Sequence, residues 1–591
     1  MSPRLWLVVI AVLFLPAAQT AGSAAQSSPA ASRRQPEPQP PHAVPQPVAA
    51  SASTAPDSVP SATMDQVVDR AIQREHALME MLKARTPFVE TYLQDLKFRP
   101  QEGPAPVRDH YFLGRMDLSE SMNRRDYLAK DTSFESRLLG GLPRLFKFEY
   151  KPLGFSWMIY ADRDKFNRQT YDFKYERREF LGDVRCIVFE VSAKKGTGHG
   201  RFHGRIWVED QDYNIVRLNG TYEPGPRNAY FFHMDSWRLN LIPDYWVPAY
   251  VYSEEGDFSE GSKDKMAFKA QTRLWGYDQQ NRAQDSELTQ VRVDSTVKDE
   301  SPESQDASPL QAQWQWQQQA GDNVIKRLEK AGLLAPEGDV DKVLETVANN
   351  LLASNNIELP GPLRARVMLT SPLETFSVGN TIVVSRGLVD VLPDEASLAM
   401  VLSRELAHML LGHNLGSKYA FNDRLLFSDE SVYQNLGFRH VPEEEAAADK
   451  KALDLLKSSP YADKLYAPGL FLRELAARGR ALSALLTPHL GTGFTDRKGT
   501  VDRMVALLDS APTLVPDKPD QIAALPLGGR VKLNAWDNRV ELIKTRPIAL
   551  TSGSGKMPLE VTPFFPRLTR YGAVVSPTAS VNAANPILSN E

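Results

Sequence analysis

Cysteine is nearly absent from this chain of 591 residues. Cys186 is the single cysteine, so neither an intramolecular disulfide nor a cysteine-rich metal site can form. A lone thiol of this kind usually behaves as a small apolar group inside a protein. We therefore expect Cys186 to be a free, buried thiol.

Long apolar runs are missing except at the N-terminus. There, Arg4 is followed by an apolar run over 5–15 and then by small residues up to Ala25. This order is typical of a secretory signal peptide over residues 1–25. The run is shorter than the ~20 residues of a membrane span, so an uncleaved anchor is the less favoured alternative. Because no cysteine lies near the cleavage region, a lipoprotein anchor is excluded, and we expect a periplasmic or secreted protein without a transmembrane span after cleavage.

A large excess of one charge is also missing. Lysine and arginine total 69, and aspartate and glutamate total 73. A balance of this kind gives the whole chain no strong attraction to nucleic acid.

The N-terminal half shows two patterns after residue 25. Residues 26–62 consist mostly of Ala, Pro, Ser and Gln, which predicts a disordered spacer. Residues 63–296 predict a helix followed by an antiparallel sheet, with helical spacing over 63–96. Turn-forming residues at 210–214 and 243–244 predict two hairpins. The expected strands are 155–160, 186–191, 204–209, 215–222, 237–242 and 245–252.

The C-terminal half follows a polar linker over 297–312. We expect a second globular domain over 313–510, which opens with a helix at 314–331. Short apolar segments at 530–533 and 540–543 predict strands of a small β appendage over 511–573, followed by a frayed tail over 574–591. The predicted fold class is therefore α+β with several domains.

The segment Ser403–His408 reads S-R-E-L-A-H. It matches the zinc-protease helix H-E-x-x-H except that Arg404 replaces the first histidine. In that motif two histidines one turn apart bind zinc, and the glutamate activates the metal-bound water. A guanidinium has no free lone pair and stays protonated, so Arg404 cannot be a ligand.

The surroundings of this segment favour a site over a chance match. A helix beginning near 393–395 carries Glu405 and His408 on the same face as several apolar residues, so both ionisable groups need partners. A second helix contains Glu445 and Asp449, four residues apart. A carboxylate on a second helix can complete a two-histidine zinc site, and a further acid can orient a ligand. Alone, such an acidic helix start is more often a simple cap.

These features together resemble a known family. Residues 323–508 resemble the CAAX prenyl protease-like zinc metallopeptidases, with matches at 379–388, 404–408, 411–413, Glu445 and Asp449. The resemblance implies a gluzincin-like metallopeptidase domain over 313–510. By position it makes Glu405 the general base, His408 and Glu445 zinc ligands, and Asp449 and Arg503 outer-sphere residues.

Two departures from the family pattern question the chemistry. Arg404 stands at the first ligand position, and 497–498 reads Arg-Lys where the family has His-Pro. At ~4 Å and an effective dielectric of about 20, a zinc ion and Arg404 repel by about 8 kcal/mol. A complete structural zinc site supplies only about 10–16 kcal/mol. The cofactor is therefore zinc if the site is active, and none if it is silent.

Few other histidines are available to replace the missing ligand. His440 precedes Glu445 by five residues and is the possible rescue ligand. We expect His413 to cap or end the motif helix, and His489 is the least constrained. If no histidine moves in, Arg404 should act as the counter-charge instead, within hydrogen-bond reach of Glu445 or Asp449.

The N-terminal sheet has a fainter resemblance to the half-barrel domains of outer-membrane lipoprotein-sorting carriers. It rests on the strand order and on the pattern around Gly182, Cys186, 206–208 and Arg217. This resemblance implies a greasy concave face for a lipid or lipoprotein. An aromatic-rich sheet core without a ligand is the favoured alternative.

Three functions remain open from the sequence. The first is a degenerate metallopeptidase-family protein that binds envelope proteins or peptides, with strand 381–385 as an edge for an extended peptide. The second is an active zinc metalloendopeptidase with an unusual ligand set and Glu405 as base. The third is a lipid or lipoprotein carrier that works through the N-terminal sheet.

Overall fold

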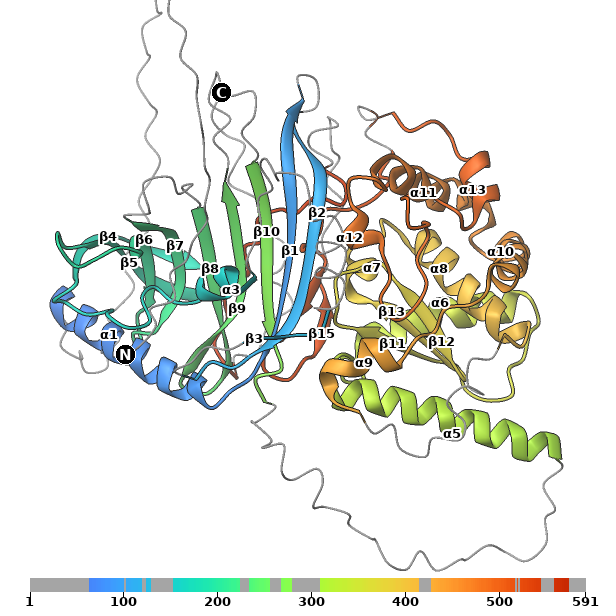
Figure 1. Ribbon diagram of the computed structural model, residues 1–591, viewed down its shortest axis with the longest axis horizontal. Coiled ribbons are helices and arrows are strands. Elements are labelled where there is room, and N and C mark those ends of the chain that lie inside the picture. The colour runs from blue at the N-terminus through green and yellow to red at the C-terminus, as the bar shows by residue number, and fades with distance from the viewer. Residues whose placement is uncertain are drawn as a thin grey trace, which may run out of the picture.

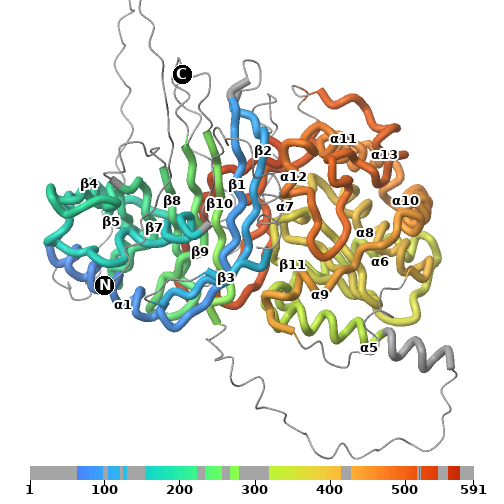
Figure 2. The backbone as a smooth tube through the Cα atoms, in the orientation of Figure 1, coloured from blue at the N-terminus to red at the C-terminus, as the bar shows by residue number. Residues whose placement is uncertain are grey.

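The computed structural model describes eleven stretches of the chain. The predicted signal peptide at 1–25, the spacer at 26–62, the start of the linker and the tail from 574 lie outside them. Two bodies lie side by side, a large curved sheet with a helix and a helix-rich body with a small sheet (Figures 1 and 2). The described residues are 63–99, 103–119, 124–128, 152–223, 233–255, 267–278, 309–413, 427–515, 518, 521–543 and 557–572.

The first body is built on a ten-stranded antiparallel sheet. Its strand order is β3-β2-β1-β10-β9-β8-β7-β6-β5-β4, so β3 and β4 are the outer strands. The large antiparallel sheet predicted for this region is confirmed. The strands are β1 Phe88–Arg99, β2 Gly103–Met116, β3 Arg124–Asp126, β4 Tyr171–Leu181, β5 Val184–Ala193, β6 Arg201–Glu209, β7 Ile215–Glu223, β8 His233–Ile242, β9 Tyr245–Glu255 and β10 Ala267–Trp275.

Helix α1, Met64–Lys83, packs on this sheet. It starts at Thr63, which forms a capping box with Gln66. Its buried Glu75 accepts two hydrogen bonds from Arg238 on β8, at 2.5 and 2.7 Å. Because both partners are nearly inaccessible to solvent, breaking this pair would leave an uncompensated buried charge. The pair fixes the helix on the sheet.

Two predicted elements are wrong. The helix predicted over 63–96 ends at Lys83, and 88–96 belongs to β1. Phe88 and Tyr92 enter one apolar cluster while Val89 and Leu93 enter another, so both faces of β1 are buried and the spacing imitates a helix. The strand predicted at 155–160 overlaps helix α3, Pro152–Trp157, because a short unalternating apolar run does not separate the two states.

The remaining predicted strands and both hairpins of this body are present. The segments from 186 to 252 lie in β5–β9, and β6 pairs with β7 as β8 pairs with β9. Tyr213 and Asp244 adopt positive φ angles of 64° and 65° in the two turns. Cys186 is a buried free thiol, as expected. The linker predicted up to 312 overlaps a helix that already begins at Pro309.

The second body surrounds a three-stranded sheet with the order β11-β13-β12. Strand β13 is therefore the central strand, and the expectation that 381–385 forms an edge is wrong, because sequence periodicity does not encode strand order. The elements are α5 Pro309–Lys330, α6 Asp339–Ser354, β11 Arg364–Met368, β12 Thr375–Val378, β13 Thr381–Ser385, α7 Arg386–Val391, α8 Glu395–Leu410, α9 Val432–Asn435, α10 Pro442–Lys457, α11 Tyr466–Arg478, α12 Ser483–Leu486 and α13 Val505–Ser510.

Neighbouring backbone also occupies both outer strands of this small sheet. Beside β11, the amide of Ala335 donates to Val367 at 2.9 Å. Beside β12, Thr375 and Thr492 exchange two backbone hydrogen bonds of 3.0 and 2.9 Å. An extended peptide therefore cannot pair along the whole of either strand.

Buried polar contacts join the two bodies. Glu90 on β1 accepts hydrogen bonds from the amide and hydroxyl of Ser371, at 2.6 and 2.9 Å, and pairs with Arg386 at 2.5 Å. Asp109 on β2 accepts the amides of Ala484 and Leu485 at 2.7 and 2.8 Å. One apolar cluster also contains residues of both bodies. The bodies therefore share a continuous interior.

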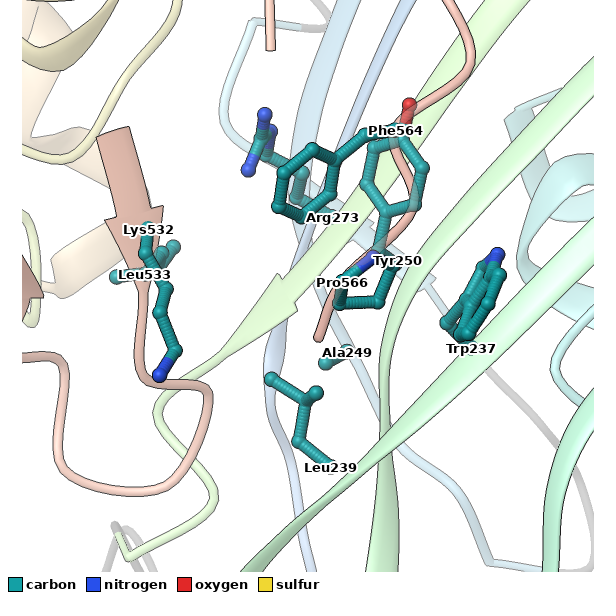
Figure 3. A pocket seen from close by; sticks show the side chains of 9 residues that line it. All are labelled: Trp237, Leu239, Ala249, Tyr250, Arg273, Lys532, Leu533, Phe564 and Pro566. Atoms are coloured by element: carbon teal, nitrogen blue, oxygen red, sulfur yellow. The ribbon is translucent and has the colours of Figure 1, made fainter. Parts of the chain in front are cut away.

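The C-terminal segment packs across the large sheet. The predicted strands appear as β14, Val531–Leu533, and β15, Val540–Leu542. The amide of Asp183 then donates to Leu568 at 2.9 Å, at the turn between β4 and β5. A small cleft with an empty volume of about 410 Å³, partly open to solvent, lies between this segment and the sheet (Figure 3). Its walls are Trp237, Leu239, Ala249, Tyr250, Arg273, Lys532, Leu533, Phe564 and Pro566.

Candidate functional site

Helix α8 carries the S-R-E-L-A-H segment in its last two turns. The helix begins after Asp394, whose side chain accepts the amide of Ser397 at 2.8 Å. It lies against α10 in the helix-rich body (Figure 1). All six residues of Ser403–His408 are buried, so every ionisable group among them faces protein.

Arg404 connects α8 to α10. Its Nη2 donates to Oε2 of Glu445 at 2.6 Å and its Nε donates to Oδ1 of Asp449 at 3.0 Å. The guanidinium carbon lies 5.1 Å from the centre of the Phe494 ring. The contacts expected between Arg404 and the two acids are therefore present. Burial opposes the charged form of Arg404, but these carboxylates more than offset it and raise the pKa.

Glu445 is the most heavily contacted acid of the site. Its Oε2 also accepts Nε of Arg503 at 3.1 Å and lies 3.6 Å from Nε2 of His408. Burial alone would raise the pKa of Glu445, but His408, Arg404 and Arg503 lower it to about 2. The carboxylate is therefore ionised at neutral pH and shared by two arginines.

Asp449 extends the network to the chain before α13. Its Oδ2 accepts the amide of Met504 at 2.7 Å. Met504 has a φ of 50°, a left-handed conformation that a residue with a side chain rarely adopts. Asp449 therefore ties α8, α10 and the start of α13 together.

Glu405 has the opposite environment. It is buried, and neither carboxyl oxygen has a hydrogen-bond partner in the described part of the chain. Burial raises its pKa above the usual value, partly opposed by His408 and Arg404. Ser377 on β12 also lowers this pKa slightly, but its hydroxyl does not reach hydrogen-bonding geometry. Burial therefore opposes the ionised form that a general base requires.

Three histidines gather at the end of α8. The ring of His408 stacks on that of His440, with centroids 3.8 Å apart and planes at 12°. Nδ1 of His408 lies 3.1 Å from Nδ1 of His413. His440 is thus close to the site, with its Nδ1 3.0 Å from Glu444. His489 instead stacks on Tyr111 of β2 with centroids 5.5 Å apart.

The turn at Gly412 explains why His413 lies beside His408. Gly412 has a φ of 71°, and the amide of His413 donates to the carbonyl of His408 at 3.0 Å. This is the Schellman arrangement, which places the second residue after the helix over its last turn. We expected His413 only to end the helix, although the Gly-His pair after the motif carries this signal.

These residues, as arranged, do not fit a zinc ion. Arg404 contacts Glu445 directly, and two guanidinium groups share the same carboxylate oxygen. In the described ranges, no group of three or more His, Cys, Asp and Glu side chains is placed to hold a metal ion. Nε2 of His408, Nε2 of His440 and Oε1 of Glu445 have no hydrogen-bond partner, but the described residues do not bring three such atoms around one point, as a catalytic zinc site requires.

The structure brings together every residue named as a candidate. His408, Glu445, Asp449 and Arg503 lie within one network, His440 stacks on it, and Glu405 lies near His408 and Arg404 without a hydrogen bond. The Arg-Lys pair at 497–498 lies in an exposed turn instead. The motif did not indicate the contact of Arg404 with the ring of Phe494.

Part of this body matches a known family. Residues 335–436 match the family model described as peptidase family M48. The chain carries an M48 domain. The matched part of the M48 domain includes Arg404, Glu405 and His408 and ends before Glu445. This identifies a metallopeptidase-type domain.

Other comparisons add little. No curated protein matches the chain. A crystal structure of a LolA superfamily protein from Nitrosomonas europaea aligns with 9% identity over 36% of this chain and 92% of that chain. The TM-score is 0.19, so this likeness carries no argument about the fold or a ligand. No described helix is both long enough and apolar enough to cross a membrane.

Proposed function

We propose that this protein is a metallopeptidase-family protein of the CAAX prenyl protease type whose M48 domain binds envelope proteins or peptides without zinc hydrolysis. Its predicted place of action is the periplasm or the outside of the cell. The observation that carries the proposal is Arg404, which contacts Glu445 at 2.6 Å and Asp449 at 3.0 Å from the first ligand position.

The charges of the site support loss of hydrolysis. A zinc peptidase needs three ligands and a water activated by an ionised glutamate. Here Arg404 cannot donate an electron pair to a metal, and burial favours the protonated form of Glu405. Arg404 thus removes one ligand, and the burial of Glu405 opposes the ionised form that would activate a water.

The rim beside the histidines is our proposed docking place for a client. Leu411 and Val441 have exposed fractions of 42% and 54%. They lie close in sequence to His413 and His440, whose ring centroids are 6.0 Å apart. Because neighbouring backbone contacts both outer strands of the small sheet, this helical rim is better suited to a client than a strand edge.

Metal content and proteolysis test the silent site. Elemental analysis of the purified protein should give no stoichiometric zinc, and Glu405→Gln should leave any proteolysis of casein unchanged. One tightly bound zinc per chain, together with proteolysis that Glu405→Gln abolishes, would establish the active zinc endopeptidase instead. Lipid that co-purifies with the protein and is bound by the N-terminal sheet would favour the lipid carrier.

Client binding needs a separate measurement. Reduced, carboxymethylated α-lactalbumin is a permanently unfolded probe, and fluorescence anisotropy would measure its affinity. The double variant Leu411→Ser/Val441→Ser should weaken binding. Val505→Ser is the matched control, because Val505 is 43% exposed on α13 and outside the rim. Equal affinity of all three proteins would reject this docking place.

A further inference from the structure

Strand β4 is a free outer strand of the ten-stranded sheet. It runs over Tyr171–Leu181 and pairs with β5 on one side only. It lies at the end of the sheet furthest from the M48 domain (Figure 1). In the residues that the structure describes, no strand pairs with its other side. A row of backbone donors and acceptors of this kind can pair with another strand.

The side chains of β4 form two sets on its two faces. A bulge between Tyr175 and Arg177 shifts the alternation by one residue. On the face towards α1 lie residues that pair with Val191, Phe189, Ile187 and Arg185 of β5; these are Phe173, Tyr175, Arg178 and Phe180. On the opposite face lie the charged residues Lys174, Glu176, Arg177 and Glu179.

Both sets are symmetric about the point between Glu176 and Arg177. Turning the strand around exchanges residue 173 with 180, 174 with 179, 175 with 178, and 176 with 177. Every exchange keeps a side chain on its own face. A strand with this property is able to pair with a copy of itself about a two-fold axis.

We propose that β4 is a self-complementary interface, on which a second copy of the chain docks its own β4 in antiparallel orientation. In this register Lys174 faces Glu179, and Glu176 faces Arg177, each twice in the dimer. Phe173 faces Phe180, and Tyr175 faces Arg178. Opposite charges and aromatic pairs directly across two strands stabilise the pairing.

The charge order also selects the register. Sliding one strand by two residues in one direction places Glu176 against Glu179 on the same face. Sliding it the other way places Lys174 against Arg177 and Asp172 against Glu179. Both neighbouring registers bring like charges together, which disfavours them.

Two of these charged residues, Lys174 and Arg177, are exposed enough to exchange partners, whereas Glu176 contacts Arg177 and Arg205 and Glu179 also accepts a hydrogen bond from Nε1 of Trp207. Lys174 contacts Glu190 at 3.4 Å with 80% of its side chain exposed, and Arg177 contacts Glu179 at 2.8 Å with 45% exposed. Exposed ion pairs are weak and exchange at little cost. Phe180 and Tyr175 are 68% and 43% exposed, so pairing also removes aromatic surface from water.

Sedimentation velocity of the purified protein over a concentration series tests the proposal. The protein should form a dimer that Lys174→Glu weakens about tenfold, because two cross-strand pairs become repulsive. The double variant Lys174→Glu/Glu179→Lys should restore the dimer. Lys195→Glu is the control, since Lys195 is exposed outside β4.

Crosslinking fixes the register. Phe173→Cys/Phe180→Cys should form a disulfide-linked dimer under mild oxidation, whereas Phe173→Cys/Arg178→Cys should not, because the second pair matches a shifted register. A monomer at every concentration would overturn the proposal and would show that the charged residues of β4 prevent edge-to-edge pairing. A dimer that ignores Lys174→Glu would overturn it equally, by placing the interface elsewhere.

Discussion

Replacing Arg404 by histidine tests whether this arginine alone prevents zinc binding, or whether the surrounding residues have also changed. The guanidinium forms hydrogen bonds to Glu445 and Asp449 at 2.6 and 3.0 Å in a fully buried position. Removing one partner of a buried ion pair costs about 3–5 kcal/mol. Arg503 still contacts Glu445, so we expect the lower end of this range.

The same substitution should make stability depend on zinc. The new imidazole, His408 and Glu445 supply the three ligands that a catalytic site requires. At a zinc concentration of about 100 times Kd, binding returns about 2.7 kcal/mol. At about 2 °C per kcal/mol for a large domain, Tm should fall by about 6 °C and recover by about 5 °C with zinc.

Scanning calorimetry of the wild type, Arg404→His and Arg404→Met, each with zinc or with EDTA, measures this. Arg404→Met has a similar volume, and its thioether is a poor ligand for zinc compared with imidazole, so its Tm should fall and stay low with zinc. If EDTA lowers the Tm of the wild type, Arg404 does not replace a metal. An Arg404→His protein as stable as the wild type without zinc would show that the ion pairs contribute nothing.

Two further predictions concern buried carboxylates. The pKa of Glu445 is about 2 in the folded protein against an ordinary 4.5, so its stabilising effect is complete above about 4.5 and is lost as the pH falls towards 2. Glu445→Gln should therefore remove about 3 kcal/mol at pH 7 and flatten the acid limb of the urea-unfolding profile; an unchanged limb would contradict the shift. Glu90→Gln should cost about 3 kcal/mol because Arg386 loses its charged partner, whereas Glu190→Gln on exposed β5 surface should cost under about 0.5 kcal/mol. Equal losses of unfolding free energy in Glu90→Gln and Glu190→Gln would show that the buried contact between the two bodies contributes no more than a surface ion pair.

Local sequence signals predicted which residues of α8 and α10 lie close together. Asp394 caps α8, the motif places Glu405 and His408 one turn apart, and the spacing of Glu445 and Asp449 puts both acids towards Arg404. Each of these signals acts within one helix, where period and capping are decisive. The pairing between the helices followed from the family resemblance and from the charges.

The contacts between residues far apart in the chain could not be predicted from the sequence. The burial of both faces of β1 made its apolar spacing look helical, and nothing local shows that β13 lies between β11 and β12. Glu90 and Arg386 are far apart in the chain, and each looks like an ordinary charged residue until the bodies meet. Gly412, which precedes His413, is a sequence signal for the turn that brings His413 next to His408.

The shared interior has a practical consequence for anyone who cuts the chain into pieces. A fragment of the second body that starts at residue 309 would expose the guanidinium of Arg386 without its carboxylate and the amides at 484–485 without Asp109. It would also expose to water the apolar surface that β1 and β2 now cover. Such a fragment should express poorly or aggregate. Its inactivity would therefore not report on the activity of the intact protein.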